Sequence, residues 1–374
     1  MKRLLLLGAG HAQLSVLAAL ARQRVPGAEV VLVSAAERQL YSGMVPGLVA
    51  GRYREAECSI ALAPLAAAAG ARLIRGQAVA LDAAEHLVTL ADGQRIDYDV
   101  LSLNTGPVQD RERIPGAHAN ALFLRPIEAF VQLWPQARAL AEEDLLDVVV
   151  IGSGAAGVEI ALAVGAGLGA RCTLTLVSSG GPVLPGYGQS VRRRALAALA
   201  RRSVQVLPGP CTAIEPGHAL IGTLRVACDV PIMATGGDAP AWLAGSGLAL
   251  DAAGFVRVGA TLQSASHPGV FAAGDVIVRD DAPHPRSGVY AVRAGPVLAQ
   301  NLRRFVAGGA LRPYAPQRRS LNLLALGDGR AIASWGGWSF QGRAMGWWKD
   351  RIDRAFVRRY QGDLRPAPGR SQAA

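Results

Sequence analysis

The sequence of 374 residues predicts an α/β fold with two Rossmann-like domains, and three observations support this fold class. Apolar runs at Leu4–Leu7 and Val148–Ile151 each stand directly before a glycine motif. Neither run alternates with polar residues, as expected for buried parallel strands. Similar segments then follow in the same order in both halves, so whole domains repeat. We expect three-layer ββα domains with a small C-terminal α+β segment.

The first glycine motif, Gly8-Ala9-Gly10, opens a helix that begins with His11 and Ala12. Glycines at such a turn let the backbone approach a pyrophosphate, whose charge meets the unpaired amides of the helix start. A protonated His11 could pair with an anion there, although a helix start opposes a positive charge. Gln13 stands where a third glycine normally permits close packing of helix on strand, so this motif is incomplete.

The second motif is complete, with Gly152, Gly154 and Gly157 around Ala155. Residues 145–170 are long enough to suggest a membrane span, but Asp147, Glu159 and several glycines interrupt them. We therefore expect a strand, a turn and a helix. The first twenty residues likewise resemble a signal peptide, whose cleavage would remove the first motif.

Both second strands end in serine. The strand over Glu29–Ser34 places Ser34 where a dinucleotide fold normally has an acid for ribose hydroxyls, and Ser178 follows the strand over 172–177. After the first of these strands, residues 41–47 form a glycine and proline loop in which Met44 and Pro46 are suited to lie against a flat ring. An ordinary surface turn explains this loop equally well.

Antiparallel strands are expected within 71–101 and 203–230, and each set leads to a Thr-Gly pair, Thr105-Gly106 and Thr235-Gly236. Gly274-Asp275 and a helix-like stretch from Tyr290 to Phe305 have no counterpart in the first half. We expect a domain formed by 1–115 and 255–310, an inserted domain over 116–254, and a basic C-terminal domain over 311–374.

Charge is concentrated at the C-terminal end of the chain. The formal net charge is +11, and residues 301–374 carry 14 basic and 4 acidic side chains. No nucleic-acid-binding motif accompanies this charge, so we expect no nucleic-acid partner. The four cysteines have no metal-ligand spacing, which argues against a metal site and favours free thiols in the cytoplasm.

Four of the six tryptophans fall within fourteen residues: Trp335, Trp338, Trp347 and Trp348. Trp348, Ile352, Ala355 and Arg359 would share one face of a helix. Tryptophan and arginine favour membrane interfaces, so one hypothesis is peripheral contact through 335–360 with the cytoplasmic face of the inner membrane. The alternative is that this face packs on the protein body or on a second subunit, as in a homodimer.

The order of these motifs from residue 8 to residue 275 resembles the two-dinucleotide-binding-domain flavoproteins, which include type II NADH dehydrogenases and sulfide:quinone oxidoreductases. Residues 8–13, 41–47 and 290–298 are most similar to the flavoprotein module fused ahead of selenide, water dikinase; no kinase portion is present. The resemblance implies that one domain binds FAD and the other NADH or NADPH.

The resemblance also implies residue roles. The FAD-binding residues would be Gly8, Gly10, His11, Ala12, Ser34, Met44, Pro46, Val79, Thr105, Gly106, Gly274 and Asp275. The NAD(P)-binding residues would be Gly152, Gly154, Ala155, Gly157, Ser178 and Gly236. Glu159 matches a catalytic glutamate near the nicotinamide and the flavin, although an acid there could simply stabilise the helix start. The choice between NADH and NADPH stays open, because Ser178-Ser179 offer neither an acid nor an arginine.

The implied activity is hydride transfer from NAD(P)H to FAD, and from FAD to a quinone or another small acceptor. No cysteine pair lies within 41–57 and no cysteine follows Cys228, which disfavours disulfide and sulfide chemistry. The alternatives are an enzyme similar to sulfide:quinone oxidoreductase, and a flavin-bearing redox sensor that docks a partner without turnover. The histidines other than His11 are interpreted as loop or surface residues.

Overall fold

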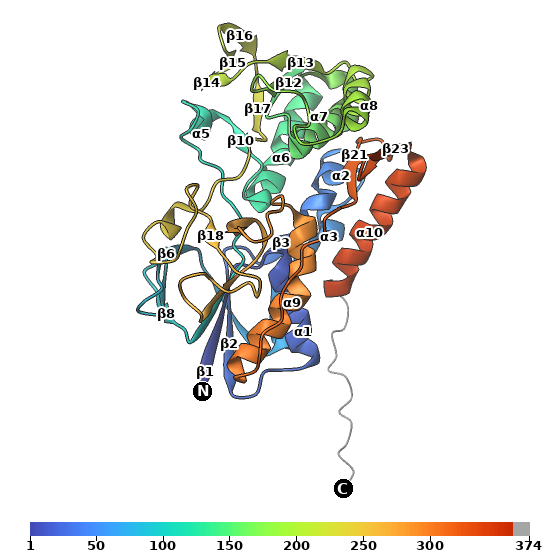
Figure 1. Cartoon of the computed structure of the whole chain (residues 1–374). Helices are drawn as coiled ribbons and strands as arrows, with labels where there is room; N and C mark the ends of the chain where they lie inside the picture. The colour runs from blue at the N-terminus through green and yellow to red at the C-terminus, as the bar shows by residue number, and fades with distance from the viewer. Residues whose placement is uncertain (362–374) are drawn as a thin grey trace.

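The computed structural model describes residues 1–361 and has two parallel sheets, one in each lobe (Figure 1). The lower lobe contains a five-stranded sheet in the order β19-β9-β1-β2-β5. Its strands are β1 (Lys2–Leu7), β2 (Ala28–Ser34), β5 (Ala71–Arg75), β9 (Val100–Leu103) and β19 (Val270–Ala272). β1 is the middle strand, and Leu4 to Leu7 are buried on both faces, as their continuous apolar run predicts.

Three layers form this lobe, which confirms the expected fold class (Figure 1). Helices pack together on one side of the sheet: α1 (His11–Arg22), α4 (Leu62–Ala69) and α9 (Gly288–Val306). The other side carries an antiparallel sheet of β6 (Ala78–Asp82), β7 (Leu87–Leu90) and β8 (Arg95–Asp97). A Cβ atom on Gly295 would lie 2.6 Å from the Ser15 side chain, so a glycine in α9 permits the close approach of α1.

The upper lobe repeats this plan with a sheet in the order β10-β17-β11-β12-β13. Its strands are β10 (Leu122–Phe123), β11 (Leu146–Ile151), β12 (Cys172–Ser178), β13 (Gln205–Pro208) and β17 (Val230–Met233). The helices are α6 (Ile127–Glu143), α7 (Ala155–Leu168) and α8 (Gln189–Ala200), and the antiparallel strands are β14 (Cys211–Glu215), β15 (His218–Ile221) and β16 (Leu224–Ala227). Residues 145–170 thus form a strand, a turn and a helix, as expected. Among the helices within residues 1–361, none combines the length and apolar character that crossing a bilayer requires.

Shorter elements connect the lobes and edges. They are β3 (Arg38–Leu40), η1 (Ser42–Met44), α2 (Val45–Val49), α3 (Glu55–Cys58), β4 (Ser59–Ala61), α5 (Ala117–Asn120), η2 (Gly169–Arg171), η3 (Ala241–Leu243), β18 (Val256–Arg257), η4 (Gly274–Val276) and β20 (Ile277–Val278).

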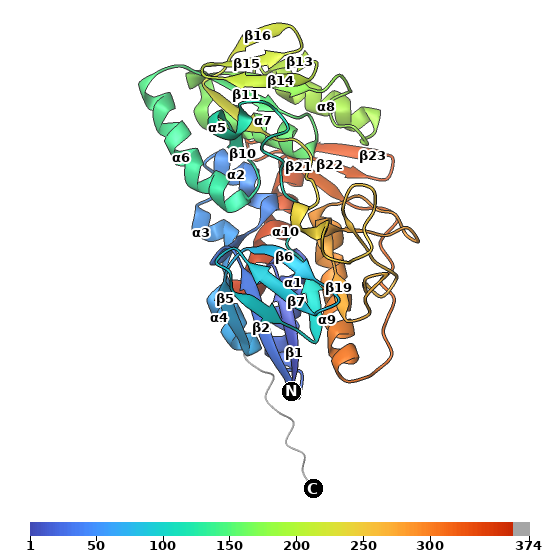
Figure 2. The same cartoon turned by 90° about the vertical axis from the view of Figure 1, so that its left-hand side faces the viewer.

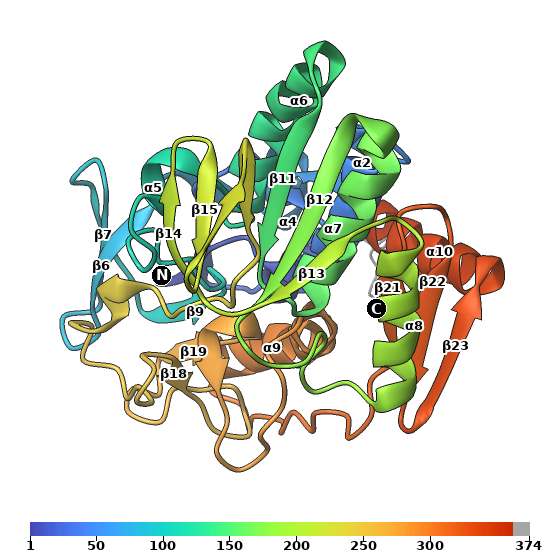
Figure 3. The ribbon, with the colours of Figure 1, turned by 90° about the horizontal axis from the view of Figure 1, so that it is seen from above.

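The C-terminal segment forms an antiparallel sheet of β21 (Asn322–Ala325), β22 (Ala331–Trp335) and β23 (Trp338–Gly342), followed by α10 (Arg343–Gln361). Helix α10 runs along one side of the molecule, and seen from above β22 lies beside α8 (Figures 1 and 3). Figure 2 shows β6 and β7 in front of the lower lobe, with α10 behind.

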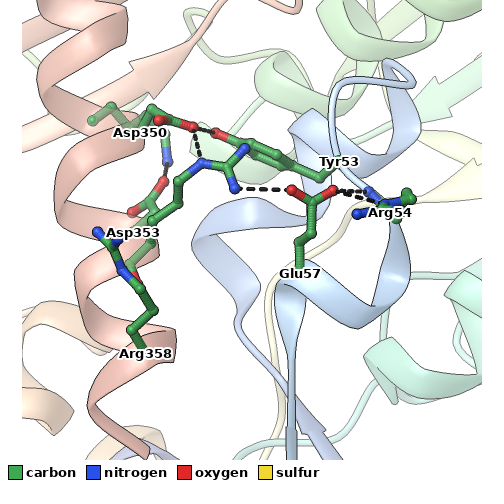
Figure 4. A network of polar contacts seen from close by, with 8 residues as sticks. Tyr53, Arg54, Glu57, Asp350, Asp353 and Arg358 are labelled. Carbon is green, nitrogen blue, oxygen red and sulfur yellow. Dashed lines mark hydrogen bonds and ion pairs between the residues drawn. The ribbon is translucent and has the colours of Figure 1, made fainter. Parts of the chain in front are cut away.

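A polar network fastens α10 to α3 and its preceding loop (Figure 4). The guanidinium of Arg354 donates to Glu57 at 2.8 Å and to Asp350 at 2.9 Å. The Tyr53 hydroxyl donates to the same Asp350 carboxylate at 2.7 Å. Because the contacts of Arg354 with Glu57 and of Tyr53 with Asp350 each span 297 positions of the chain, they fix where the helix lies.

The two faces of α10 differ in an unexpected way. The side chains buried against the body are Lys349, Asp353, Phe356, Val357 and Tyr360. Trp348, Ile352, Ala355 and Arg359 do share one face, as predicted, but that face is exposed. Trp348 is 41% and Ile352 40% exposed, so within the described chain the aromatic face does not pack on the protein body.

Candidate functional site

The carboxyl ends of three adjacent strands bring distant motifs together in the lower lobe. β1 ends before Gly8, β9 before Asn104 and β19 before Ala273-Gly274. The register pairs Leu7 with Leu103, and Leu103 with Ala272, so the three ends are level. In open parallel sheets this edge is where ligands bind.

Asn104 joins these strand ends. Its Oδ1 atom accepts hydrogen bonds from the backbone amides of Ala12 at 3.0 Å and Gln13 at 3.1 Å. Its Nδ2 atom donates to the Ala273 carbonyl at 2.6 Å. The side chain therefore caps the amino end of α1 and links it to β19.

The glycines of the first motif make room for Asn104. A Cβ atom on Gly8 or on Gly10 would lie within 2.6 Å of Asn104 atoms, and one on Gly274 within 2.5 Å. Packing within the protein thus already requires these glycines, in addition to the ligand approach that the sequence suggested.

Gln13 occupies the position of the missing third glycine. Its side chain is fully buried, and both of its polar atoms form hydrogen bonds. Its Nε2 atom donates to the Ser102 carbonyl at 2.8 Å, and its Oε1 atom accepts from the Ser102 hydroxyl at 3.0 Å. These two hydrogen bonds between Gln13 of α1 and Ser102 of β9 hold α1 against the sheet. In the usual motif, close packing at a third glycine has this role.

Two buried polar atoms at this edge have no partner within the described residues, His11 Nε2 and Asp275 Oδ1. Burial, aided by the charge of Arg125, lowers the pKa of His11 to about 4. Without an anion beside it, the imidazole is therefore neutral near pH 7, and the pairing of a protonated His11 with an anion stays a prediction. Burial raises the pKa of Asp275, whereas Arg125, 3.8 Å away, opposes that rise.

The remaining predicted FAD residues lie in several environments. Met44 and Pro46 are buried in η1 and α2, so the loop over 41–47 is a packed element and not a surface turn. The Ser34 hydroxyl bonds to the Ala36 carbonyl within its own turn. Val79 is 45% exposed on β6, outside the parallel sheet, whereas Thr105 and Gly106 directly follow Asn104.

The second glycine motif has a more open geometry. A Cβ atom on Gly157 would lie 1.8 Å from the Gly152 carbonyl oxygen, so helix α7 approaches β11 closely. By contrast, Gly154 and Gly236 have no atom within 4 Å of such a Cβ position. No side chain caps α7, and no hydrogen bond within residues 1–361 engages the amides of Ala155, Ala156 and Gly157. This helix start can receive an anion directly.

Ser178 ends β12 and is buried, with its carbonyl accepting hydrogen bonds from Gly180 and Gly209. Within residues 1–361 the hydroxyl of Ser178 makes no hydrogen bond, and nothing beside it distinguishes a ribose from a phosphorylated ribose. The choice between NADH and NADPH therefore stays open.

Glu159 lies on α7 and contacts the C-terminal segment. Its Oε1 atom accepts a hydrogen bond from the Ala325 amide at 2.7 Å, which joins α7 to β21. Burial raises the pKa of Glu159 to about 7, although the Lys349 charge and the Ala325 hydrogen bond oppose the rise. At neutral pH this carboxyl group is therefore poised between holding and releasing a proton.

Sequence reasoning missed several residues that surround these sites. Asn104 precedes a recognisable Thr-Gly pair, but nothing in the sequence indicates its contact with α1. His284 lies in a loop, as expected, but its ring stacks on Tyr290 with centroids 4.5 Å apart, and its Nε2 atom is buried. Lys349 is buried beside Asp353, a placement that nothing in the sequence pattern of this basic stretch indicates.

The four cysteines are free, as expected, and only Cys58 and Cys228 are buried. Burial raises the pKa of both thiols to about 12 and that of Cys211 to about 11, and it also raises that of Cys172. All four are protonated at neutral pH, which disfavours thiolate chemistry.

Two parallel-sheet domains, each with a glycine turn at its carboxyl edge, define a class of oxidoreductases that hold dinucleotides. Residues 2–295 match the pyridine nucleotide-disulphide oxidoreductase family. The chain belongs to this family of oxidoreductases and is similar to type II NADH dehydrogenases. Its cofactors are FAD and NADH or NADPH.

Named relatives are similar at modest identity. The chain is 25% identical over 325 residues to demethylphylloquinone reductase of Synechocystis sp., covering 82% of this chain and 79% of the relative. It is also 25% identical over 287 residues to alternative NAD(P)H-ubiquinone oxidoreductase C1 of Arabidopsis thaliana, covering 66% of this chain and 55% of that protein.

Solved structures share the fold. The sulfide:quinone oxidoreductase of Aquifex aeolicus superposes with a TM-score of 0.81 at 20% identity, covering 98% of this chain and 93% of that one. NDH2 of Plasmodium falciparum in complex with NADH gives 0.80 at 12% identity, covering 98% and 99%. These likenesses confirm the two-domain fold.

The residues present fit both cofactors. At the lower edge, unpartnered His11 Nε2 and Asp275 Oδ1 offer buried polar contacts that a ribityl and phosphate chain would satisfy. At the upper edge, open space over Gly154 and the uncapped start of α7 suit a pyrophosphate.

Proposed function

We propose that this enzyme oxidises NADH or NADPH through FAD and reduces a quinone or another small acceptor. One observation carries the proposal: the two glycine turns lead into helices whose amino ends differ. The amino end of α7, after Gly154, has no side-chain cap, whereas that of α1 is capped by Asn104 and lies beside Asp275. The names of the cyanobacterial and plant relatives both include a quinone, which supports the choice of acceptor.

The domain assignment follows from these sites. Residues 1–115 and 255–310 would hold FAD, with Gly8, Gly10 and Asp275 nearest the cofactor. Residues 116–254 would hold the nicotinamide nucleotide, and residues 311–374 would be the basic C-terminal domain, whose Ala325 contacts Glu159 of α7. Bound FAD supplies the chemistry of accepting a hydride and passing on its electrons.

Glu159 is the proposed proton donor to the reduced acceptor. Its Oε1 atom is held by the Ala325 amide, which leaves Oε2 to carry the proton. A carboxyl group with a pKa of about 7 can both donate and be recharged near neutral pH. The alternative role of Glu159, in which its charge stabilises the start of α7, does not require the Glu159 carboxyl group to be buried.

We also propose that the C-terminal segment contacts a membrane surface and so brings the site to a lipid-soluble quinone. We define the tryptophan surface as the exposed side chains Trp335, Trp338, Phe340, Trp347, Trp348 and Ile352. Trp338 on β23 is 72% exposed and Trp347 on α10 is 64% exposed, and Arg343 and Arg351 of α10 are also exposed. Aromatic rings with adjacent arginines match an interface with anionic headgroups. A second copy of the chain is the competing occupant.

Steady-state oxidation of NADH and NADPH with a water-soluble quinone tests the enzyme proposal. Gly154→Ala places a Cβ atom in the open space over the second motif, where it meets no protein atom within 4 Å, so it should raise the KM for the nucleotide at least about tenfold. Gly181→Ala is the matched control, because a Cβ atom on Gly181 also faces open space but lies outside the motif. If the protein is instead a flavin-bearing redox sensor, neither the parent protein nor the two variants will oxidise NADH or NADPH with the quinone.

A further inference from the structure

A crevice of about 230 Å³ lies between α7, α8 and the turn that joins β21 to β22. Its apolar lining consists of Leu162, Ala198 and Leu326. Its polar lining consists of Arg201, Arg202, Asp328 and Arg330. Three guanidinium groups and one carboxylate give the lining an excess of positive charge.

The hydrogen bonds among the lining residues do not neutralise all of this positive charge. Arg330 donates to Asp328 from Nε at 2.9 Å and from Nη2 at 2.6 Å. Arg202 donates to the Gly165 carbonyl at 3.3 Å and lies 3.6 Å from Asp328. Arg201 makes no side-chain hydrogen bond or ion pair within residues 1–361. The one carboxylate is thus engaged by two arginines, and the third has no counterion there.

We propose that this crevice binds a phosphate-type anion, with Arg201, Arg202 and Arg330 as its ligands. Guanidinium groups match phosphate oxygens in geometry and charge. The volume lies below the roughly 300–1,000 Å³ of pockets for drug-sized ligands, so the crevice suits one or two phosphate groups better than a whole nucleotide.

Two sources can present this chemistry, a soluble phosphate compound and a phospholipid headgroup. The crevice lies close to the start of α10, because a Cβ atom on Gly346 would meet the Gly329 carbonyl oxygen of the crevice turn at 1.9 Å. Trp347 of the tryptophan surface is the next residue. A headgroup held in the crevice would therefore lie near side chains that we assign to the membrane.

Calorimetric titration with inorganic pyrophosphate tests the site, using the full-length, FAD-loaded protein with saturating NAD⁺ so that the start of α7 is already occupied. Arg201→Ala should weaken binding at least about tenfold, because a charge-assisted contact is lost. Arg193→Ala is the matched control: it removes the same charge from an exposed position of α8 that does not line the crevice. Asp328→Asn should instead tighten binding, since it removes the opposing charge.

Flotation with phosphatidylglycerol vesicles, compared with phosphatidylcholine vesicles, distinguishes the two sources. If Arg201→Ala weakens both pyrophosphate and phosphatidylglycerol binding, the ligand is a headgroup; if only pyrophosphate binding falls, it is a soluble phosphate. Equal behaviour of Arg201→Ala and Arg193→Ala in both assays would overturn the proposal. Neither assay needs turnover, so the result is independent of the proposed redox activity.

Discussion

Lys349 and Asp353 form an ion pair of 2.7 Å on the inward face of α10, where their side chains are only 11% and 6% exposed. Lys349 also donates to the Gly43 carbonyl at 2.7 Å, in the loop that precedes α2. The pair thus joins the C-terminal helix to the lower lobe at the loop expected to face the flavin. The buried face of α10 thus contains an ion pair beside Phe356, Val357 and Tyr360, while the tryptophans of the helix are exposed.

The buried pair predicts an asymmetric mutational response. Lys349→Met alone should lower the free energy of unfolding by about 3–5 kcal/mol, because it leaves the Asp353 carboxylate buried and uncompensated. The double variant Lys349→Met/Asp353→Leu should recover much of this loss, since no buried charge remains. Urea unfolding curves measure both values. A double variant that is less stable than the single one would contradict this account.

Asn104→Ala should destabilise the protein by at least about 2 kcal/mol, because it removes three hydrogen bonds and leaves the amides of Ala12 and Gln13 without their acceptor. Asn120→Ala is a suitable control, since Asn120 makes one exposed hydrogen bond to Gly116 and should cost less than about 1 kcal/mol. Thermal unfolding of the flavin-free proteins compares them. Equal losses would show that Asn104 does not hold the strand ends together.

Glu159→Gln should slow reoxidation of the reduced enzyme by a quinone about a hundredfold or more, because the amide cannot donate the carboxyl proton. Reduction of the enzyme by NADH or NADPH should change little. In the unaltered enzyme, the reoxidation rate should fall as pH rises through about 7, where the Glu159 carboxyl loses its proton. Stopped-flow absorbance separates the two half-reactions. Glu85→Gln, on an exposed turn, is the control.

Loss of exposed tryptophans should weaken membrane binding. Trp338→Ser/Trp347→Ser removes two of the most exposed side chains of the tryptophan surface and should lower the affinity for anionic vesicles at least about tenfold. Leu224→Ser, an exposed apolar residue on β16 in the upper lobe, is the matched control. These substitutions avoid the truncation of α10, which would expose its buried face. If both variants bind vesicles as the parent does, a second copy of the chain becomes the better occupant, and ultracentrifugation would detect it.

The sequence predicts the fold well because strong local signals coincide with its central elements. The apolar runs before both glycine motifs are middle strands of their sheets, and the Thr-Gly and Gly-Asp pairs follow adjacent strand ends. Local pattern and tertiary position agree there, as expected for the conserved geometry of a strand-to-helix turn.

The sequence predicts much less about contacts between distant segments. Asn104 could not be recognised as a cap for α1, because the two are joined only when the sheet forms. The pattern of α10 identifies an amphipathic helix but does not say which face is buried; Lys349 and Asp353 are buried because each neutralises the other. Gln13 looked like a defect of the first motif until Ser102 supplied its partners.

The most direct test of the central claim is an anaerobic titration of the FAD-loaded enzyme with NADH and, separately, NADPH. At least one of the nucleotides should bleach the visible flavin absorbance at one equivalent, and added quinone should restore the absorbance. A protein that binds FAD but keeps its absorbance with both nucleotides would contradict it.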